Sequence, residues 1–65
     1  MNCYDEIFNT IKELIENKEI SSYQINKDTG ISYGNINAMR RRERRIENLS
    51  LNNAKILYEY AKKVL

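Results

Sequence analysis

Hydrophobic residues recur at intervals of three and four near the start of the chain. These positions are Tyr4, Ile7, Phe8, Ile11, Leu14 and Ile15. Because this spacing places side chains on one side of an α-helix, the pattern predicts an amphipathic helix over residues 3–17, beginning near Asn2 or Asp5. A second periodic stretch predicts a long helix over residues 51–65, with Ser50 as its N-cap. Its apolar positions are Leu51, Ala54, Leu57, Tyr58, Ala61, Val64 and Leu65.

A short helix is predicted over residues 22–29. Ser21 followed three residues later by Gln24 has the spacing of a capping box, in which each of the two side chains bonds the backbone of the other residue. Gly30 comes directly after this stretch, and glycine readily adopts the left-handed conformation that ends a helix. These three residues therefore mark both ends of the helix.

Another short helix is predicted to follow, over about residues 33–41. Ser32 is its expected N-cap, and Ile36 and Met39 form its inner side because they are three residues apart. Residues 42–48 contain neither glycine nor proline. The helix therefore either continues for one more turn or gives way to a loop that carries arginines.

Length and composition limit both the fold and the chemistry. The 65 residues are expected to form one domain, residues 1–65, and helical periodicity without an alternating stretch predicts an all-α fold. The chain has no histidine and one cysteine, Cys3, so we expect no metal site, disulfide, cofactor or small-molecule ligand. No nucleophile lies beside a plausible base, so we do not expect an enzyme. Short apolar runs and an unpaired cysteine favour a cytoplasmic protein without a membrane segment.

Charge is distributed unevenly along the chain. Residues 1–19 contain two lysines and five acidic residues, which gives a net charge of −3. Residues 20–45 contain one lysine and five arginines against two acidic residues, which gives +4, and residues 46–65 add +1. The basic charge lies on the segment of the two short helices, so one face of the molecule is expected to meet a polyanion such as DNA.

The chain resembles the Cro/repressor-type (Xre-like) helix-turn-helix proteins, especially small regulators of Gram-positive bacteria and their phages and plasmids. The resemblance covers most of the chain and includes the segment IENLSLNNAKILYEYAKKV. The other residues that carry it are Ile25, Gly30, Ile31, Ser32, Ile36 and Met39. It implies a compact bundle of four or five helices that binds double-stranded DNA, with the helix beginning at Tyr33 in the major groove.

The sequence departs from the family pattern at three positions. Asn26 stands where the family usually has a small residue such as alanine, and Thr29 stands where it usually has an apolar one. Many relatives have a glycine near the position of Arg42. An arginine there either extends the helix or is strained at positive φ.

The polar start of the helix at residues 33–41 supplies candidate base contacts. Tyr33 follows the N-cap, where a side chain can meet a base edge or a thymine methyl group. Asn35 and Asn37 each carry a donor and an acceptor and can pair with adenine, and we rank Asn35 first. Gly34 has no side chain and is expected to let the backbone approach DNA closely.

Candidate contacts to the DNA backbone surround these residues. They are Ser22, Gln24, Lys27, Gly34, Arg40, Arg41, Arg42 and Arg44. Helix N-termini attract phosphate, and a guanidinium neutralises it. The run RRRERR from Arg40 to Arg45 has an alternative interpretation as a solvated charged face, but its place beside the two short helices favours contact with DNA.

The resulting hypothesis is a transcriptional repressor that reads a pseudo-palindromic operator as a homodimer. Tyr58 and Tyr60, with Val64 and Leu65, exceed the needs of so small a core, so we predict a dimer interface formed by Tyr58, Val64 and Leu65. The alternative is a small protein-binding module, such as a phage- or plasmid-encoded inhibitor or antitoxin with the same fold.

Overall fold

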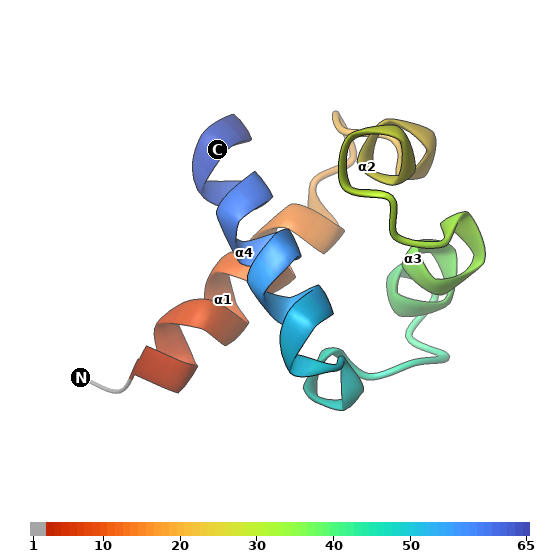
Figure 1. The fold of residues 1–65 in the computed structure, drawn as a ribbon. Helices are drawn as coiled ribbons and strands as arrows, with labels where there is room; N and C mark the ends of the chain where they lie inside the picture. The colour runs from red at the N-terminus through yellow and green to blue at the C-terminus, as the bar shows by residue number, and fades with distance from the viewer. Residues whose placement is uncertain (1–2) are drawn as a thin grey trace.

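The computed structural model describes residues 3–65 and contains four α-helices and one turn of 3-10 helix (Figure 1). The elements are α1 (Cys3–Glu16), α2 (Ser22–Thr29), α3 (Tyr33–Arg40), η1 (Ile46–Asn48) and α4 (Leu51–Val64). No strand occurs over this range. The all-α prediction is therefore confirmed, and Asn2, one of two expected starts of the first helix, lies outside the described residues.

The core lies where α1 and α4 cross and extends to the inner sides of α2 and α3 (Figure 1). Its buried hydrophobic residues are Ile11, Leu14, Ile15, Ile25, Ile31, Ile36, Met39, Leu57, Tyr60 and Ala61. The four α-helices all contribute, α2 through Ile25 alone, and in the other three the three- and four-residue spacing turns one side of the helix inward. Within residues 3–65 no helix is long and apolar enough to cross a membrane.

Serine residues cap three of the helices as the sequence predicts. The hydroxyl oxygen of Ser21 accepts a hydrogen bond from the Gln24 backbone N–H at 3.0 Å. Ser32 and Ser50 accept equivalent bonds at the starts of α3 and α4. The second half of the predicted capping box is replaced, because the Gln24 side chain donates to Asp28 Oδ2 at 2.8 Å.

Asn26 and Thr29 both form hydrogen bonds at the turn between α2 and α3. Gly30 adopts φ 78°, the left-handed conformation expected of it. Asn26 Nδ2 donates to the Ile31 carbonyl at 2.7 Å. Thr29 Oγ1 donates to the Ile25 carbonyl at 2.6 Å and accepts from the Ile31 N–H at 3.2 Å. Both side chains therefore bond backbone groups at the end of α2 and in the turn.

The arginines after α3 lie in a loop, which resolves the two alternatives left by the sequence. The helix ends at Arg40, and Arg42 adopts φ 62°. The Glu43 N–H donates to the Ala38 carbonyl at 2.8 Å, and the Arg42 N–H donates to the Met39 carbonyl at 3.1 Å. This pair of bonds is a Schellman motif, in which Arg42 occupies the position that usually holds glycine.

Replacing Arg42 with glycine should stabilise the fold slightly. A residue with a Cβ is strained in the left-handed conformation by about 1–2 kcal/mol, and the extra freedom of glycine in the unfolded chain offsets part of the gain. We expect the melting temperature to rise by about 2–4 °C in circular dichroism. Arg41→Gly is the control, because Arg41 has an ordinary φ of −86° and should lose stability. An equal decrease of melting temperature in Arg42→Gly and Arg41→Gly would contradict backbone strain at Arg42.

Tyr60 belongs to the core and does not form part of an apolar surplus on α4. Its side chain is 9% exposed, and its hydroxyl donates to Asp28 Oδ2 at 2.7 Å, which ties α4 to α2. Burial and the adjacent carboxylate raise the pKa of Tyr60 from 10.0 to about 12. Hydrogen bonds from Gln24 and Tyr60 lower the pKa of Asp28. The earlier expectation that Tyr60 is unused by the core is therefore wrong.

The raised pKa of Tyr60 predicts a loss of stability at alkaline pH. The stability that the un-ionised Tyr60 hydroxyl contributes is fully present below pH 10, the pKa of this tyrosine in the unfolded chain. It is lost as pH rises through about 12, the pKa in the folded protein. The urea midpoint of the wild type should therefore fall more steeply between these values than that of Tyr60→Phe. Tyr58→Phe leaves the buried Tyr60 hydroxyl in place, so its urea midpoint should change with pH as that of the wild type does. If the urea midpoints of all three proteins fell in parallel with rising pH, ionisation of Tyr60 would not contribute to the loss of stability.

Candidate nucleic-acid interface

The first turn of α3 presents polar and aromatic groups on the molecular surface. Tyr33 is 51% exposed, Gly34 is exposed and Asn35 is half-buried, whereas Ile36 is fully buried on the opposite side. A Cβ built on Gly34 would contact only the Ser32 hydroxyl, at 3.7 Å. Packing within the described residues therefore does not require glycine at this position.

A hydrogen bond between α2 and α3 uses two of the predicted DNA contacts. Ser22 is 6% exposed, and its hydroxyl donates to Asn37 Oδ1 at 2.6 Å. The Ser22 hydroxyl therefore lies between α2 and α3 and is not directed toward solvent, where it would have to be to contact a DNA phosphate. Asn37 is half-buried, and its amide oxygen is engaged in the same bond. The pair fixes α3 against α2.

Arg40 differs from the arginines that follow it. Its Nη2 donates to the backbone carbonyls of Asn17 and Ile20, at 3.1 Å and 2.5 Å, in the connection between α1 and α2. Its Nε is buried and has no hydrogen-bond partner among the described residues. Arg40 therefore acts inside the fold, where it satisfies carbonyls at the end of α1. One signal in the sequence could have revealed this role, because Arg40 follows the buried Ile36 by four residues, on the same side of α3.

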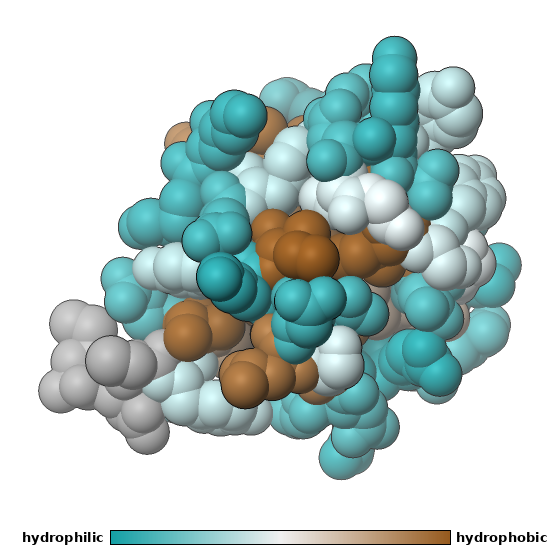
Figure 2. Space-filling view, viewed as in Figure 1, coloured by the Kyte–Doolittle hydropathy of each residue, from teal (hydrophilic) through white to brown (hydrophobic). Residues whose placement is uncertain are grey.

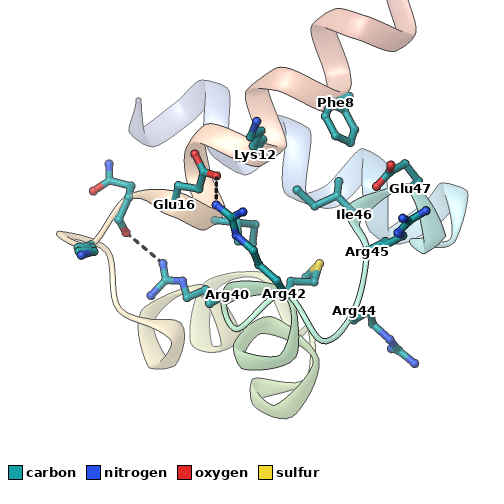
Figure 3. A pocket seen from close by; sticks show the side chains of 13 residues that line it. Phe8, Lys12, Glu16, Arg40, Arg42, Arg44, Arg45, Ile46 and Glu47 are labelled. Carbon is teal, nitrogen blue, oxygen red and sulfur yellow. Dashed lines mark hydrogen bonds and ion pairs between the residues drawn. The ribbon is translucent and has the colours of Figure 1, made fainter.

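The arginines of the loop after α3 are exposed, and three of them have partners. Arg41 pairs with Glu43 at 3.2 Å, and Arg42 pairs with Glu16 of α1 at 3.8 Å. Arg44 Nη1 donates to Asn35 Oδ1 at 2.7 Å. Figure 3 shows Arg42 directed toward Glu16, whereas Arg44 points away from α1. Surface ion pairs contribute little to stability, so the guanidinium groups of Arg41 and Arg42 can exchange their carboxylate partners for phosphate.

A groove separates the second half of α1 from the arginine loop (Figure 3). Phe8, Ile15, Met39 and Ile46 form its apolar part. Its basic residues are Lys12, Lys18, Arg40, Arg42, Arg44 and Arg45, against two acidic residues, Glu16 and Glu47. The groove is therefore electropositive. Residues 3–65 contain no cluster of three histidine, cysteine or acidic side chains that could hold a metal ion.

The remaining predicted backbone contacts lie on α2. Lys27 is exposed, and so is Gln24, whose side-chain amide donates to Asp28. Tyr23 beside them is 65% exposed and was not among the predicted contacts. The capping pattern alone does not indicate that an aromatic residue is exposed in the first turn of α2.

The predicted dimer residues lie along α4. Val64 is 42% exposed and Leu65 is 54% exposed, whereas Tyr58 is half-buried with the Lys62 ammonium 5.9 Å from its ring centre. Leu51, at 88%, is the most exposed large hydrophobic residue in the described part of the chain. Figure 2 shows hydrophobic side chains gathered near α4 on a face that is otherwise mainly hydrophilic.

The chain matches no protein-family model, no curated protein and no solved structure.

Proposed function

We propose that this protein is a sequence-specific DNA-binding repressor in which α2 and α3 form a Cro/repressor-type helix-turn-helix. The observation that carries the proposal is the orientation of α3. Its inner side is fixed by buried Ile36 and Met39 and by the bond from Ser22 to Asn37, which leaves Tyr33 and Asn35 on its outer side. A helix held in this way can enter the major groove with its first turn toward the base edges.

Electrostatics supports the same orientation. The exposed guanidinium groups of Arg41, Arg42 and Arg44 lie in the loop directly after α3, and Lys27 is exposed on α2. Glu16 of α1 lies beside this loop and pairs with Arg42 at 3.8 Å, but the groove that they line contains six basic residues against two acidic ones. Basic groups beside α3 can neutralise phosphates on the strands that border the groove.

Hydrogen bonds inside the protein reduce the number of side chains that we propose to contact DNA. Tyr33 and Asn35 are the proposed base contacts, and the proposed backbone contacts are Gln24, Lys27, Gly34, Arg41, Arg42 and Arg44. Ser22 and Arg40 leave the set because their polar groups are used inside the protein. Asn37 is secondary, since its amide oxygen is already bonded to Ser22.

The Gly34 contact leads to a direct prediction. Gly34→Ala should retain or slightly raise stability, by up to about 1 kcal/mol, because alanine favours a helix and space is available. Affinity for DNA should nevertheless fall, because the added methyl group prevents close approach of the backbone. Thermal melting and DNA titration measure the two effects, with Asn52→Ala on α4 as the control. Unchanged affinity of Gly34→Ala would exclude close approach at this position.

We propose that the repressor is a homodimer that joins through α4. Leu51, Tyr58 and Leu65 follow one another at seven-residue intervals, so they lie along one side of the helix, and Val64 is exposed beside Leu65. A single copy can read only a few base pairs, and two copies provide the specificity that an operator requires. Such a dimer would act by occupying DNA that polymerase needs.

A gel shift tests the proposed function. The DNA upstream of the protein's own coding sequence should give a shifted band that cognate DNA, but not a scrambled fragment, competes away. Sedimentation should show a dimer that the double variant Tyr58→Ala, Leu65→Ala weakens. A band that both competitors remove equally would count against sequence-specific repression, and a wild type that is monomeric both free and on DNA would exclude the dimer.

The electropositive groove supports a second candidate function, a module that binds an acidic protein. Its apolar residues Phe8 and Ile46 lie between basic side chains from α1 and from the loop (Figure 3). An acidic helix with a hydrophobic side would match both features. In that case Phe8→Ala would abolish partner binding, whereas DNA binding would not require Phe8.

A further inference from the structure

Arg44 and Asn35 are joined on the outer side of α3, and this bond determines what Asn35 can recognise. The donor Arg44 Nη1 lies 2.7 Å from Asn35 Oδ1. The bond connects the loop after α3 with the first turn of the same helix. Since neither residue is part of the core, the fold does not need this contact for packing. The inference that follows rests on the proposed binding of DNA through α3.

The geometry of the pair holds the Asn35 amide in one orientation. A guanidinium has only donors, so the amide must turn its oxygen toward Arg44 and its Nδ2 away from it. A bond from a charged donor at 2.7 Å is short and strong. The Arg44 backbone is also held, because its N–H donates to the Ala38 carbonyl at 3.2 Å. The Arg44 side chain therefore extends from a backbone position that is fixed by a hydrogen bond to α3.

The bond changes the hydrogen-bonding character of Asn35. A free asparagine offers one acceptor and one donor, which match the N6 amino group and N7 of adenine. With Oδ1 bonded to Arg44, the pair offers the Nδ2 donors of Asn35 and the remaining N–H groups of the guanidinium. Guanine presents two acceptors in the major groove, O6 and N7, whereas adenine directs an N6 donor toward the same place.

We propose that Arg44 and Asn35 form one recognition unit that selects guanine over adenine. Arg44 is then a specificity-determining residue, and this role replaces the phosphate contact proposed for it above. Adenine is disfavoured because its N6 amino group would face the remaining N–H donors of the Arg44 guanidinium, donor against donor. This assignment replaces the adenine contact that the asparagine alone would predict.

Selection from random double-stranded DNA tests this proposal with four proteins. Asn35→Ala identifies the position concerned, as the base at which preference is lost relative to the wild type. At that position the wild type should select guanine, and Arg44→Ala should reduce the preference for guanine over adenine by about tenfold or more. Arg41→Ala is the matched control, because Arg41 pairs with Glu43 and not with Asn35. It should weaken binding without changing the selected base.

The outcomes separate this inference from the proposed function. A wild type that enriches no motif would reject both the repressor and the recognition unit. A wild type that enriches a motif containing adenine at the Asn35 position, or an Arg44→Ala variant that keeps the same guanine preference, would reject the recognition unit alone. Circular dichroism of Arg44→Ala should be unchanged, since Arg44 is exposed, and this excludes loss of folding as the cause.

Discussion

Replacement of Arg40 by alanine is expected to destabilise the protein by about 2–3 kcal/mol, because each of its hydrogen bonds comes from a charged donor. The guanidinium bonds the carbonyls of Asn17 and Ile20 in the connection between α1 and α2, and both bonds are lost with the side chain. In a domain of this size such a loss should lower the melting temperature by roughly 10–20 °C. Thermal unfolding followed by circular dichroism measures it.

Arg41→Ala is the matched control for this experiment. Arg41 is the next residue along the chain, but its side chain is exposed and pairs only with Glu43. Its removal should change stability by no more than about 0.5 kcal/mol. If both variants melted at the same temperature, Arg40 would have no special role in joining α1 to α3.

The second large effect is expected on DNA affinity, in the double variant Arg41→Ala, Arg42→Ala. Each phosphate that an arginine neutralises releases about 0.9 of a counterion, so the slope of log affinity against log salt should fall by up to about 2. Binding at low salt should weaken about tenfold or more for all sequences alike. The exposed ion pairs of both residues should cost little stability when they are lost.

A second double variant, Lys55→Ala, Lys63→Ala, removes the same amount of charge from exposed positions on α4. It should retain a salt slope close to that of the wild type, because only charges in contact with phosphate release counterions. Equal slopes for the two double variants would mean that the arginine loop acts through overall charge alone, and would give weight to the protein-binding alternative.

The helices and their ends could be predicted from local sequence. Ser21, Ser32 and Ser50 each cap the helix that the sequence assigns to them, and Gly30 ends α2 in the left-handed conformation. Such signals are readable because a cap and its partner are separated by only a few residues. The predicted bounds of α1, α3 and α4 differ from the structure by one residue at their C-terminal ends.

Contacts between distant residues could not be predicted in the same way. Arg40 bonds carbonyls 20 and 23 residues away, and the hydroxyl of Tyr60 reaches Asp28 across 32 residues. In the sequence Arg40 is one of five similar arginines, and Tyr60 is one of two tyrosines on α4. Only the packing of the helices assigns these two side chains to the interior.

The candidate site was predictable only in the features that depend on local sequence. The exposure of Tyr33 follows from its place beside the cap of α3, opposite the buried side of the helix. The bond from Arg44 to Asn35 depends on the turn at Arg42, whose positive φ brings the chain back along α3. The sequence left that turn open between two conformations, so the combined donor surface of Asn35 and Arg44 could not be foreseen.

Selection from random DNA tests the central claim, sequence-specific binding through α3, most directly. The account predicts that the wild type enriches a pseudo-palindromic motif whose half-sites lie about one turn of DNA apart, roughly 34–36 Å, as two copies of the domain require. The double variant Tyr33→Ala, Asn35→Ala, which alters only exposed and half-buried side chains of α3, should fold normally and enrich no motif. Enrichment of the same motif by both proteins, or of no motif by the wild type, would contradict the account.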